Sequence, residues 1–371
     1  MRRRLAARLT LIAALALLAV PVLAALAFGT GLWAAFSIWD ALGAAWKVAE
    51  WGIGSMLIVL GALFATRLLS VLFVPLPDPE GVRLSSKDAR DFHRLIEGMT
   101  WVLEAGHIDH VWVTPDMNAA ILQRPRRGCF GRIETHLLVG LPLAHSVTCP
   151  QLVAVLAHEF AHLAVQRKGL GKYGALLRAW WLRALDKMGD VFPVFGKQVD
   201  HWLRRLYSDM ARLARIEEFE ADALAVRLVD ADLLGKTLVE VSLREQFLLQ
   251  DYWPRVLAQC RVRAKPLVRP YRDLGLGMTA GFLRTAADDA SADDDSSQSL
   301  HPTMKERLSA LRVAPHDASS PLPENLPSAA SHYFAPLLLT LAWVFDRAWW
   351  KDVRPNWQLT YRCVRYKHKH R

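Results

Sequence analysis

The segment HEFAH, at positions 158–162, has the residue types and spacing in this chain that are best suited to chemistry. The apolar residues around it, from position 149 to 166, predict a helix. On a helix His158 and His162 project from the same face, so two imidazoles can bind one zinc ion at about 2 Å each. Glu159 is then placed to remove a proton from water at that ion. The pattern predicts a hydrolytic zinc centre.

The alternative is that both histidines are ordinary core residues of an amphipathic helix. The residues around them are strongly apolar, and unpaired imidazoles are costly to bury in such surroundings. This cost favours a bound metal ion. Catalytic zinc usually has three protein ligands, so a third ligand is needed elsewhere. The metzincin pattern, which continues with a glycine and a third histidine, is excluded by Val165 and Lys168.

A second helical pattern, IEEFEADALAVRLV at positions 216–229, opens with carboxylates and supplies the candidate third ligand. Glu218 and Asp222 are one turn apart and share a face. We expect Glu218 to bind the single zinc ion, and Asp222 to accept the free N–H of a ligand histidine. Glu217 and Glu220 point to other faces and are expected to be solvated surface charges. By contrast, His107 and His110 are expected to be loop residues and not ligands.

Four motifs between positions 116 and 311 together resemble a known family: MNAAIL, VLAHEFAHL, EEFEADALA and LHPTMKERLSAL. They are similar to the integral-membrane zinc proteases that include the bacterial HtpX heat-shock protease and the eukaryotic CAAX prenyl protease. The resemblance implies a gluzincin-type mechanism. The three zinc ligands and the base that activates water would be His158, His162, Glu218 and Glu159.

The resemblance also assigns roles to residues outside the two zinc motifs. It implies that Asn118 opens the strand bordering the substrate cleft, and that His301 and Arg307 approach the site as catalytic candidates. From the residues alone, His301-Pro302 indicates a helix start. Arg307 is a fixed cation that can pair with a carboxylate such as Asp222 or stabilise a developing oxyanion. A plain helix cap and a surface arginine are the alternative.

Two apolar stretches near the N-terminus predict transmembrane helices, at about 9–29 and 51–74. Arginines flank the outer ends of both, while the short connection between them has little positive charge. The positive-inside rule therefore predicts a multi-pass protein of the cell inner membrane with a cytoplasmic catalytic domain. A cleaved signal peptide is the alternative for the first stretch, although its apolar run continues to Phe36.

The composition limits the partners of the chain. A net charge of +10 is compatible with nucleic acid, but no basic patch forms a recognisable nucleic-acid module, and we expect none as a partner. The lipid bilayer and protein or peptide substrates are the expected partners. The four cysteines are scattered, which favours a reducing compartment. The region between the zinc motifs is too charged for the additional spans of the relatives, which argues for an open cleft and against prenylated substrates.

The predicted architecture is an α+β, mostly helical chain with a zincin-like catalytic domain behind a two-span hairpin. Short strand-like runs at 110–114, 119–123 and 135–140 predict a small sheet. The expected parts are a membrane anchor (1–77), a zinc metallopeptidase domain (78–315) with a flexible acidic loop (286–299), and a helical segment with a basic tail (316–371). The expected function is membrane-anchored endopeptidase activity, in a setting such as membrane protein quality control. The alternative is a zinc-binding scaffold or chaperone without proteolysis.

Overall fold

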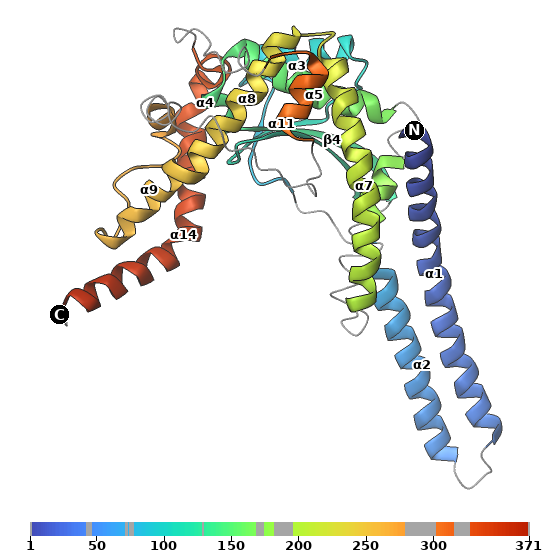
Figure 1. The fold of residues 1–371 in the computed structure, drawn as a ribbon. Coiled ribbons are helices and arrows are strands. Elements are labelled where there is room, and N and C mark those ends of the chain that lie inside the picture. The colour runs from blue at the N-terminus through green and yellow to red at the C-terminus, as the bar shows by residue number, and fades with distance from the viewer. Residues whose placement is uncertain are drawn as a thin grey trace. The chain divides into compact units, whose positions relative to one another are not determined.

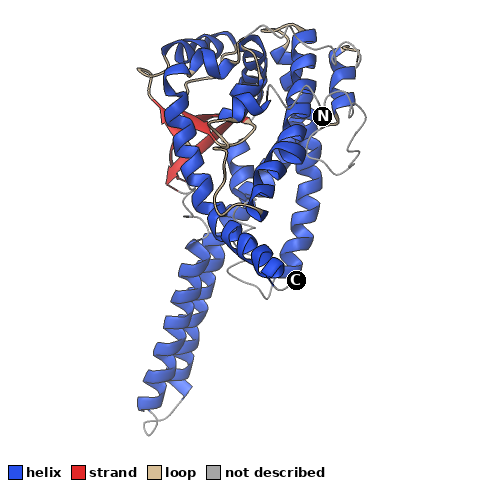
Figure 2. Ribbon diagram, turned by 90° about the vertical axis from the view of Figure 1, so that its left-hand side faces the viewer, coloured by secondary structure: helices blue, strands red, loops and turns tan. Residues whose placement is uncertain are grey.

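The structure is a computed structural model, and the chain in it is mostly helical with one small mixed sheet (Figure 2, red). It describes residues 2–41, 47–70, 73, 78–127, 130–167, 174–181, 196–278, 302–314 and 327–369. The expected acidic loop at 286–299 lies outside the described residues. The chain forms two compact units. The first comprises Met1–Pro77, Gln123–Glu134 and Gln166–Ile216; the second comprises Asp78–Leu122, Thr135–Val165 and Glu217–Arg371.

The first unit contains an N-terminal helical hairpin of α1 (Arg2–Ala41) and α2 (Lys47–Ser70), which lie side by side (Figure 1, blue). Both helices are long and apolar enough to cross a membrane. A Cβ atom at Gly31 would lie 2.9 Å from the carbonyl oxygen of Leu57, and one at Gly61 would lie 3.2 Å from that of Ala27. The two backbones therefore approach as closely as glycine allows, which is typical of packed helices in membranes.

The first turns of α1 pack against protein within this unit. Leu9 and Ala13 are fully buried, and Thr10 accepts a hydrogen bond of 2.9 Å from the buried guanidinium of Arg178. The region of α1 that packs against α2 lies further along, where Val20 is buried in one cluster with Leu68. The helix thus extends beyond the expected span at both ends, and its early apolar residues are covered by neighbouring helices.

The sheet has the strand order β1-β2-β4-β3, with β1 and β2 antiparallel and β2 and β4 parallel. Its strands are β1 (Val82–Leu84), β2 (His110–Thr114), β3 (Ala119–Arg127) and β4 (Phe130–Gly140). The predicted sheet is therefore present, with β3 and β4 longer than the apolar runs indicated. Backbone pairing continues both strands past their apolar residues into a part of the sequence that is basic and polar.

The core of the second unit is built on this sheet. Helix α3 (Arg90–Val102) buries Phe92, Ile96 and Met99, whose spacing places them on one helical face. Helix α5 (Cys149–Arg167) contributes fully buried leucines and Phe160 to the same cluster. The C-terminal helices also contribute, because Phe334 and Phe345 are buried there. The core therefore joins residues from nearly the whole length of this unit.

The remaining helices of the second unit surround this core. They are α4 (Leu141–Ser146), the end of α7 (Gly196–Ala225), α8 (Ala231–Phe247), η4 (Leu248–Tyr252), α9 (Trp253–Ala258), η5 (Gln259–Arg261), α11 (Met304–Leu311), α13 (Ala329–Tyr333), η6 (Ala335–Leu337) and α14 (Leu338–Lys369).

A buried hydrogen-bond network fixes the start of α5. The Gln151 side chain accepts from the backbone N–H of Thr148 at 2.8 Å and from the Thr148 hydroxyl at 3.0 Å. The Gln151 amide in turn donates to the carboxylate of Glu240 on α8. The Thr148 hydroxyl is thus a donor to the glutamine oxygen and not an acceptor from it. Every polar atom of the buried Gln151 side chain is engaged, so α5 is tied to α8 at this end.

A half-buried histidine in α4 predicts how stability depends on pH. Burial lowers the pKa of His145 from 6.5 to about 4. Below pH 6.5 His145 becomes protonated in the unfolded chain but stays neutral in the folded chain. The free energy of unfolding therefore falls by about 1.4 kcal/mol per pH unit until about pH 4. We expect wild type to lose about 2 kcal/mol more than His145→Gln between pH 7 and 5. Denaturant unfolding at both pH values measures this, with the exposed His332→Gln as control; equal losses in all three proteins contradict it.

Candidate active site

Helices α5 and α7 bring two histidines and one glutamate together. The Nε2 atoms of His158 and His162 are 3.0 Å apart. The two carboxylate oxygens of Glu218 lie 3.3 Å from these nitrogens, one oxygen to each. Ligand atoms of a tetrahedral zinc ion are about 3.3 Å apart, because each bond is about 2 Å long. The three side chains therefore converge at the separation that one zinc ion requires, with two nitrogen donors and one oxygen donor.

Burial distinguishes Glu218 from the other glutamates of its segment. Glu218 is 5% exposed, whereas Glu217 is half-buried and Glu220 is exposed. Ala221 and Ala225, which follow on the same helix, are small and fully buried. Because they lack bulk, α7 can pack closely here and bury the carboxylate of Glu218. An isolated buried carboxylate is costly, so Glu218 needs the positive partners that this site provides.

Asp222 orients the first histidine from behind. Its Oδ1 atom lies 2.9 Å from Nδ1 of His158, one turn of α7 beyond Glu218. An N–H at Nδ1 donates to this carboxylate, which leaves the Nε2 lone pair directed toward the centre of the site. Burial acts to raise the pKa of Asp222, but hydrogen bonds from His158 and Arg307 outweigh it and hold the pKa below its usual range. Asp222 is therefore an ionised acceptor.

Helix α11 supplies the cation that balances these carboxylates. Arg307 donates to both oxygens of Asp222, from Nε at 2.8 Å and from Nη2 at 2.6 Å, and its Nη1 lies 3.6 Å from Glu218. This bidentate geometry is the strongest that an arginine and a carboxylate form. Because Asp222 is only 1% exposed, the pair is shielded from water. Arg307 thus connects to His158 through Asp222 and also lies close to Glu218.

The start of α11 differs from the expected one at His301-Pro302. The helix begins at Met304, because Thr303 is the N-cap residue and forms a capping box with Glu306. The hydroxyl of Thr303 accepts from the Glu306 backbone N–H at 3.3 Å, and the Glu306 carboxylate accepts from the Thr303 backbone N–H at 2.8 Å. The box fixes the rotation of α11 and hence the direction of Arg307. His301 lies outside the described residues.

Loss of Arg307 is expected to destabilise the fold strongly. Arg307→Leu leaves the buried carboxylate of Asp222 without its cation, and breaking a buried pair in this way costs roughly 3–5 kcal/mol. Arg307→Lys retains the charge but not both hydrogen bonds, so its loss is smaller. Denaturant unfolding of the detergent-solubilised protein measures both. Lys305→Leu, on an exposed position of the same helix, is the matched control. An Arg307→Leu protein as stable as Lys305→Leu contradicts the expectation.

Glu159 follows the first histidine on α5 and is half-buried. Burial raises the pKa of its carboxyl group above the usual range, while the neighbouring His158 and His162 act in the opposite direction. A carboxylate with a raised pKa is a stronger base than an exposed one. Its position one residue after a histidine of the converging group therefore suits it to proton transfer.

Asn118 lies at the edge of the sheet. It is exposed and directly precedes β3, which is an edge strand of the described sheet. The backbone is held there by Gly140, whose N–H donates to the carbonyl of Asn118 at 2.7 Å. A Cβ atom at Gly140 would lie 1.7 Å from the carbonyl oxygen of Asp116, so only glycine permits this crossing of β4 and the residues before β3.

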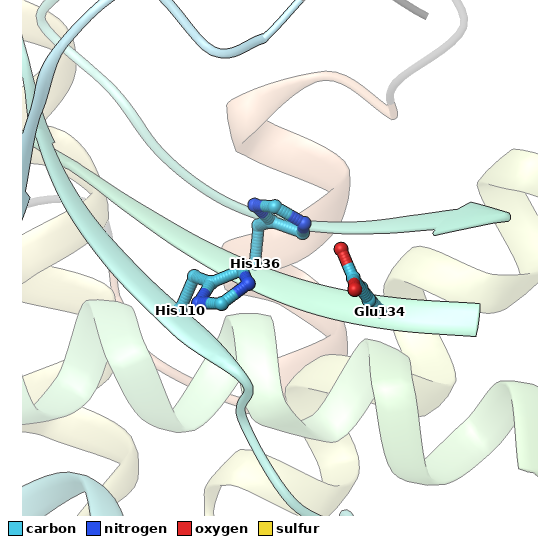
Figure 3. Close-up of side chains that lie close together, drawn as sticks. All are labelled: His110, Glu134 and His136. Carbon is cyan, nitrogen blue, oxygen red and sulfur yellow. The ribbon is translucent and has the colours of Figure 1, made fainter. Parts of the chain in front are cut away.

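A second group of possible metal ligands, which no local pattern in the sequence indicated, consists of His110, Glu134 and His136 (Figure 3). His107 is a loop residue as expected, but His110 opens β2 opposite His136 of β4. The indole N–H of Trp112 donates to Nδ1 of His136 at 3.1 Å. A neutral imidazole that accepts at Nδ1 carries its proton on Nε2, which argues against His136 as a metal ligand. Only strand pairing reveals this group, because His110 is far in sequence from Glu134 and His136.

The first group indicates a class of protein: two histidines from one helix and a glutamate from another, with a further glutamate beside the first histidine, are the residues typical of a metallopeptidase site. The family model described as Peptidase family M48 matches residues 131–314, which include both zinc motifs and α11. The chain belongs to this metallopeptidase family of the HtpX and CAAX proteases, whose members are metal-dependent and typically use zinc. The resemblance stated from the motifs is thereby confirmed. Comparisons with curated proteins and with solved structures gave no match.

Proposed function

We propose that this protein is a membrane-anchored, zinc-dependent endopeptidase with a zincin-like catalytic unit. The observation that carries the proposal is the convergence of His158, His162 and Glu218 at 3.0–3.3 Å within a family of metallopeptidases. Bound zinc would supply a Lewis acid that polarises a peptide carbonyl and lowers the pKa of water. These three side chains are the proposed ligands of one zinc ion per chain.

The other residues of the site have roles that follow from their contacts. Glu159 accepts a proton from the attacking water and is placed to pass it to the departing amine. Asp222 holds the imidazole of His158 in the tautomer that presents Nε2 to the ion. Arg307 keeps Asp222 ionised and fixed in place. From the family resemblance, His301 is also proposed as a catalytic residue.

Substrates are proposed to be proteins or peptides that bind in an extended conformation. Strand β3, which begins after Asn118, is an edge strand of the described sheet and is suited to pairing with such a segment. Pairing would leave the substrate backbone hydrogen-bonded and fixed in direction, so that one carbonyl faces the ligand group. Membrane proteins, including damaged ones, are the proposed substrates because the anchor restricts what the enzyme can reach.

The anchor is proposed to be the α1–α2 hairpin, with the catalytic unit on the cytoplasmic side of the cell inner membrane. Two apolar helices and the arginines that flank them support this arrangement. N-terminal sequencing of the mature protein tests the hairpin. A mature start near Ala25 would show that the first helix is removed, and the proposed orientation would then be wrong.

Removal of the metal tests the enzymatic proposal. We expect 1,10-phenanthroline to abolish cleavage of labelled casein by the full-length protein in detergent, and about one equivalent of zinc to restore it. Zinc content is measured in parallel by mass spectrometry. Protein that holds one zinc ion but cleaves neither casein nor a model membrane protein would be a zinc-binding scaffold or chaperone, and the proposal of proteolysis would fail.

A further inference from the structure

Helix α9 and the residues that follow it, here called the connecting segment from position 261 to 269, form an unusually basic part of the surface. Positions 252–272 include six basic residues and no acidic one. Arg255 pairs with Asp251 at 2.6 Å and Arg272 with Asp273 at 3.0 Å. The other four are exposed, and none forms an ion pair within the part of the chain that the structure describes: Arg261, Arg263, Lys265 and Arg269. A concentrated positive charge therefore faces solvent here.

Helix α14 continues this charge along an aromatic groove. Its residues Trp343, Arg347, Trp350, Lys351 and Arg354 line a depression of about 510 Å³. The Arg347 guanidinium lies 5.3 Å from the centre of the Trp343 ring, as a cation–π pair.

A second depression, of about 340 Å³, joins the connecting segment to the helix. Lys265 and Arg269 line it from one side, and Trp343, Arg347 and Trp350 line it from the other. The connecting segment 261–269 and residues 343–354 of α14 thus form one continuous area, which we call the basic–aromatic surface. Figure 1 shows α9 (orange), which precedes the connecting segment, and α14 (red), which contributes residues 343–354.

Hydrogen bonds hold the basic–aromatic surface in place. The indole N–H of Trp357, a residue only 2% exposed, donates to the backbone carbonyl of Arg263 at 2.9 Å. The backbone N–H of Tyr271 donates to Asp346 of α14 at 2.8 Å. The connecting segment is therefore tied to α14 near both of its ends. A partner that binds here does not have to order the segment first, which lowers the entropic cost of binding.

Large apolar side chains project from the same area. Val262 is 74% exposed and Leu267 is 71% exposed, each between basic residues. Aliphatic residues are not usually left in water in such a group, and their exposure marks an interaction site.

The combination of these side chains identifies the partner. Arginine and lysine attract anionic headgroups, tryptophan favours the headgroup region, and exposed valine and leucine gain by entering the acyl boundary. A nucleic acid would use the charge and stack on the rings, but the exposed Val262 and Leu267 would gain nothing from a phosphate backbone. We propose that the basic–aromatic surface docks the catalytic unit on the anionic lipid headgroups of a bilayer. This contact is additional to the helical anchor and depends neither on zinc nor on proteolysis.

Hydrogen exchange of the full-length protein in nanodiscs tests the proposal. One set of discs contains only phosphatidylcholine and the other contains about one third phosphatidylglycerol. Each basic residue near an anionic surface strengthens docking about fivefold. We therefore expect exchange in peptides covering 260–268 to slow tenfold or more in the anionic discs at low salt. The difference should disappear in ~1 M salt, where the Debye length falls to about 3 Å.

Charge reversal provides the matched comparison. Arg263→Glu/Lys265→Glu should remove the protection in anionic discs, while Lys87→Glu/Arg90→Glu, which reverses two exposed charges elsewhere in the same unit, should preserve it. Exchange in α5 serves as the check that each variant is folded. Equal exchange in both kinds of disc overturns the proposal, as does protection that survives reversal at positions 263 and 265. Stronger protection by an added single-stranded RNA in neutral discs than by anionic lipid also overturns it.

Discussion

Replacing Glu159 with glutamine is expected to lower the turnover number by about 10²–10⁴-fold, the range that a positioned general base contributes. The amide is nearly isosteric with the carboxylate but cannot accept a proton from water. The metal ligands are unchanged, so zinc content should stay the same. Single-turnover cleavage of a fluorogenic peptide at saturating substrate measures the chemical step, since it excludes product release.

Two controls make this result specific. Glu220→Gln changes an exposed glutamate on α7 and should cleave at the wild-type rate. Substrate binding by Glu159→Gln should also be close to wild type, because the loss falls on the reaction and not on binding. A Glu159→Gln protein with normal zinc content that cleaves as fast as wild type would falsify the assignment of Glu159 as the base.

Glu218→Ala is expected to abolish stoichiometric zinc binding. Removing a group that only orients a zinc ligand typically costs 10–100-fold in affinity, and we expect loss of a direct ligand to cost more than about 100-fold. The two imidazoles that remain, 3.0 Å apart, then lack the carboxylate that bridges their ring nitrogens at 3.3 Å. Zinc retained after dialysis against a chelator of known affinity, determined by mass spectrometry, gives the measurement.

The neighbouring glutamate provides the comparison for this experiment as well. Glu220→Ala removes the same charge from the same helix, but from an exposed position, and should bind zinc as wild type does. Asp222→Asn should weaken binding by about 10–100-fold, because it disturbs the orientation of His158 without removing a ligand. If Glu218→Ala and Glu220→Ala bind zinc equally well, Glu218 is not the third ligand.

The Arg307 contact links the site to fold stability. Because the bidentate pair of Arg307 and Asp222 lies behind His158, damage to it should affect stability and metal affinity together. A change confined to Glu159 should affect neither. Comparing Arg307→Leu with Glu159→Gln thus separates a residue that stabilises the site from the residue proposed to react.

Much of the candidate metal site was predictable from sequence because its geometry is local. Residues one turn apart on a helix share a face, so the spacing of His158 and His162 and that of Glu218 and Asp222 predicted which side chains point the same way. The apolar setting of α5 predicted that the histidines would be costly to bury without a ligand. The motifs also predicted the family, which the match over residues 131–314 confirmed.

Other predictions were limited because local pattern does not specify long-range contacts. The pattern His301-Pro302 placed the start of α11 two residues too early, because the capping box of Thr303 and Glu306 begins the helix at Met304. The length of the apolar run in α1 did not show that Leu9 and Thr10 would be covered by protein, because hydropathy does not distinguish lipid from a protein interior. The pairing of His110 with His136 depended on strand register, which no local pattern contains.

The sequence by itself determined the local part of this protein: the helices, the faces on which the reactive residues lie, and the family. The tertiary structure alone decided that Arg307 donates to both oxygens of Asp222, that His110 lies opposite His136, and that a basic segment near position 265 meets the tryptophans of α14. The physical reason is that side-chain direction repeats within a helix over a few residues, whereas burial and charge pairing depend on how distant segments pack.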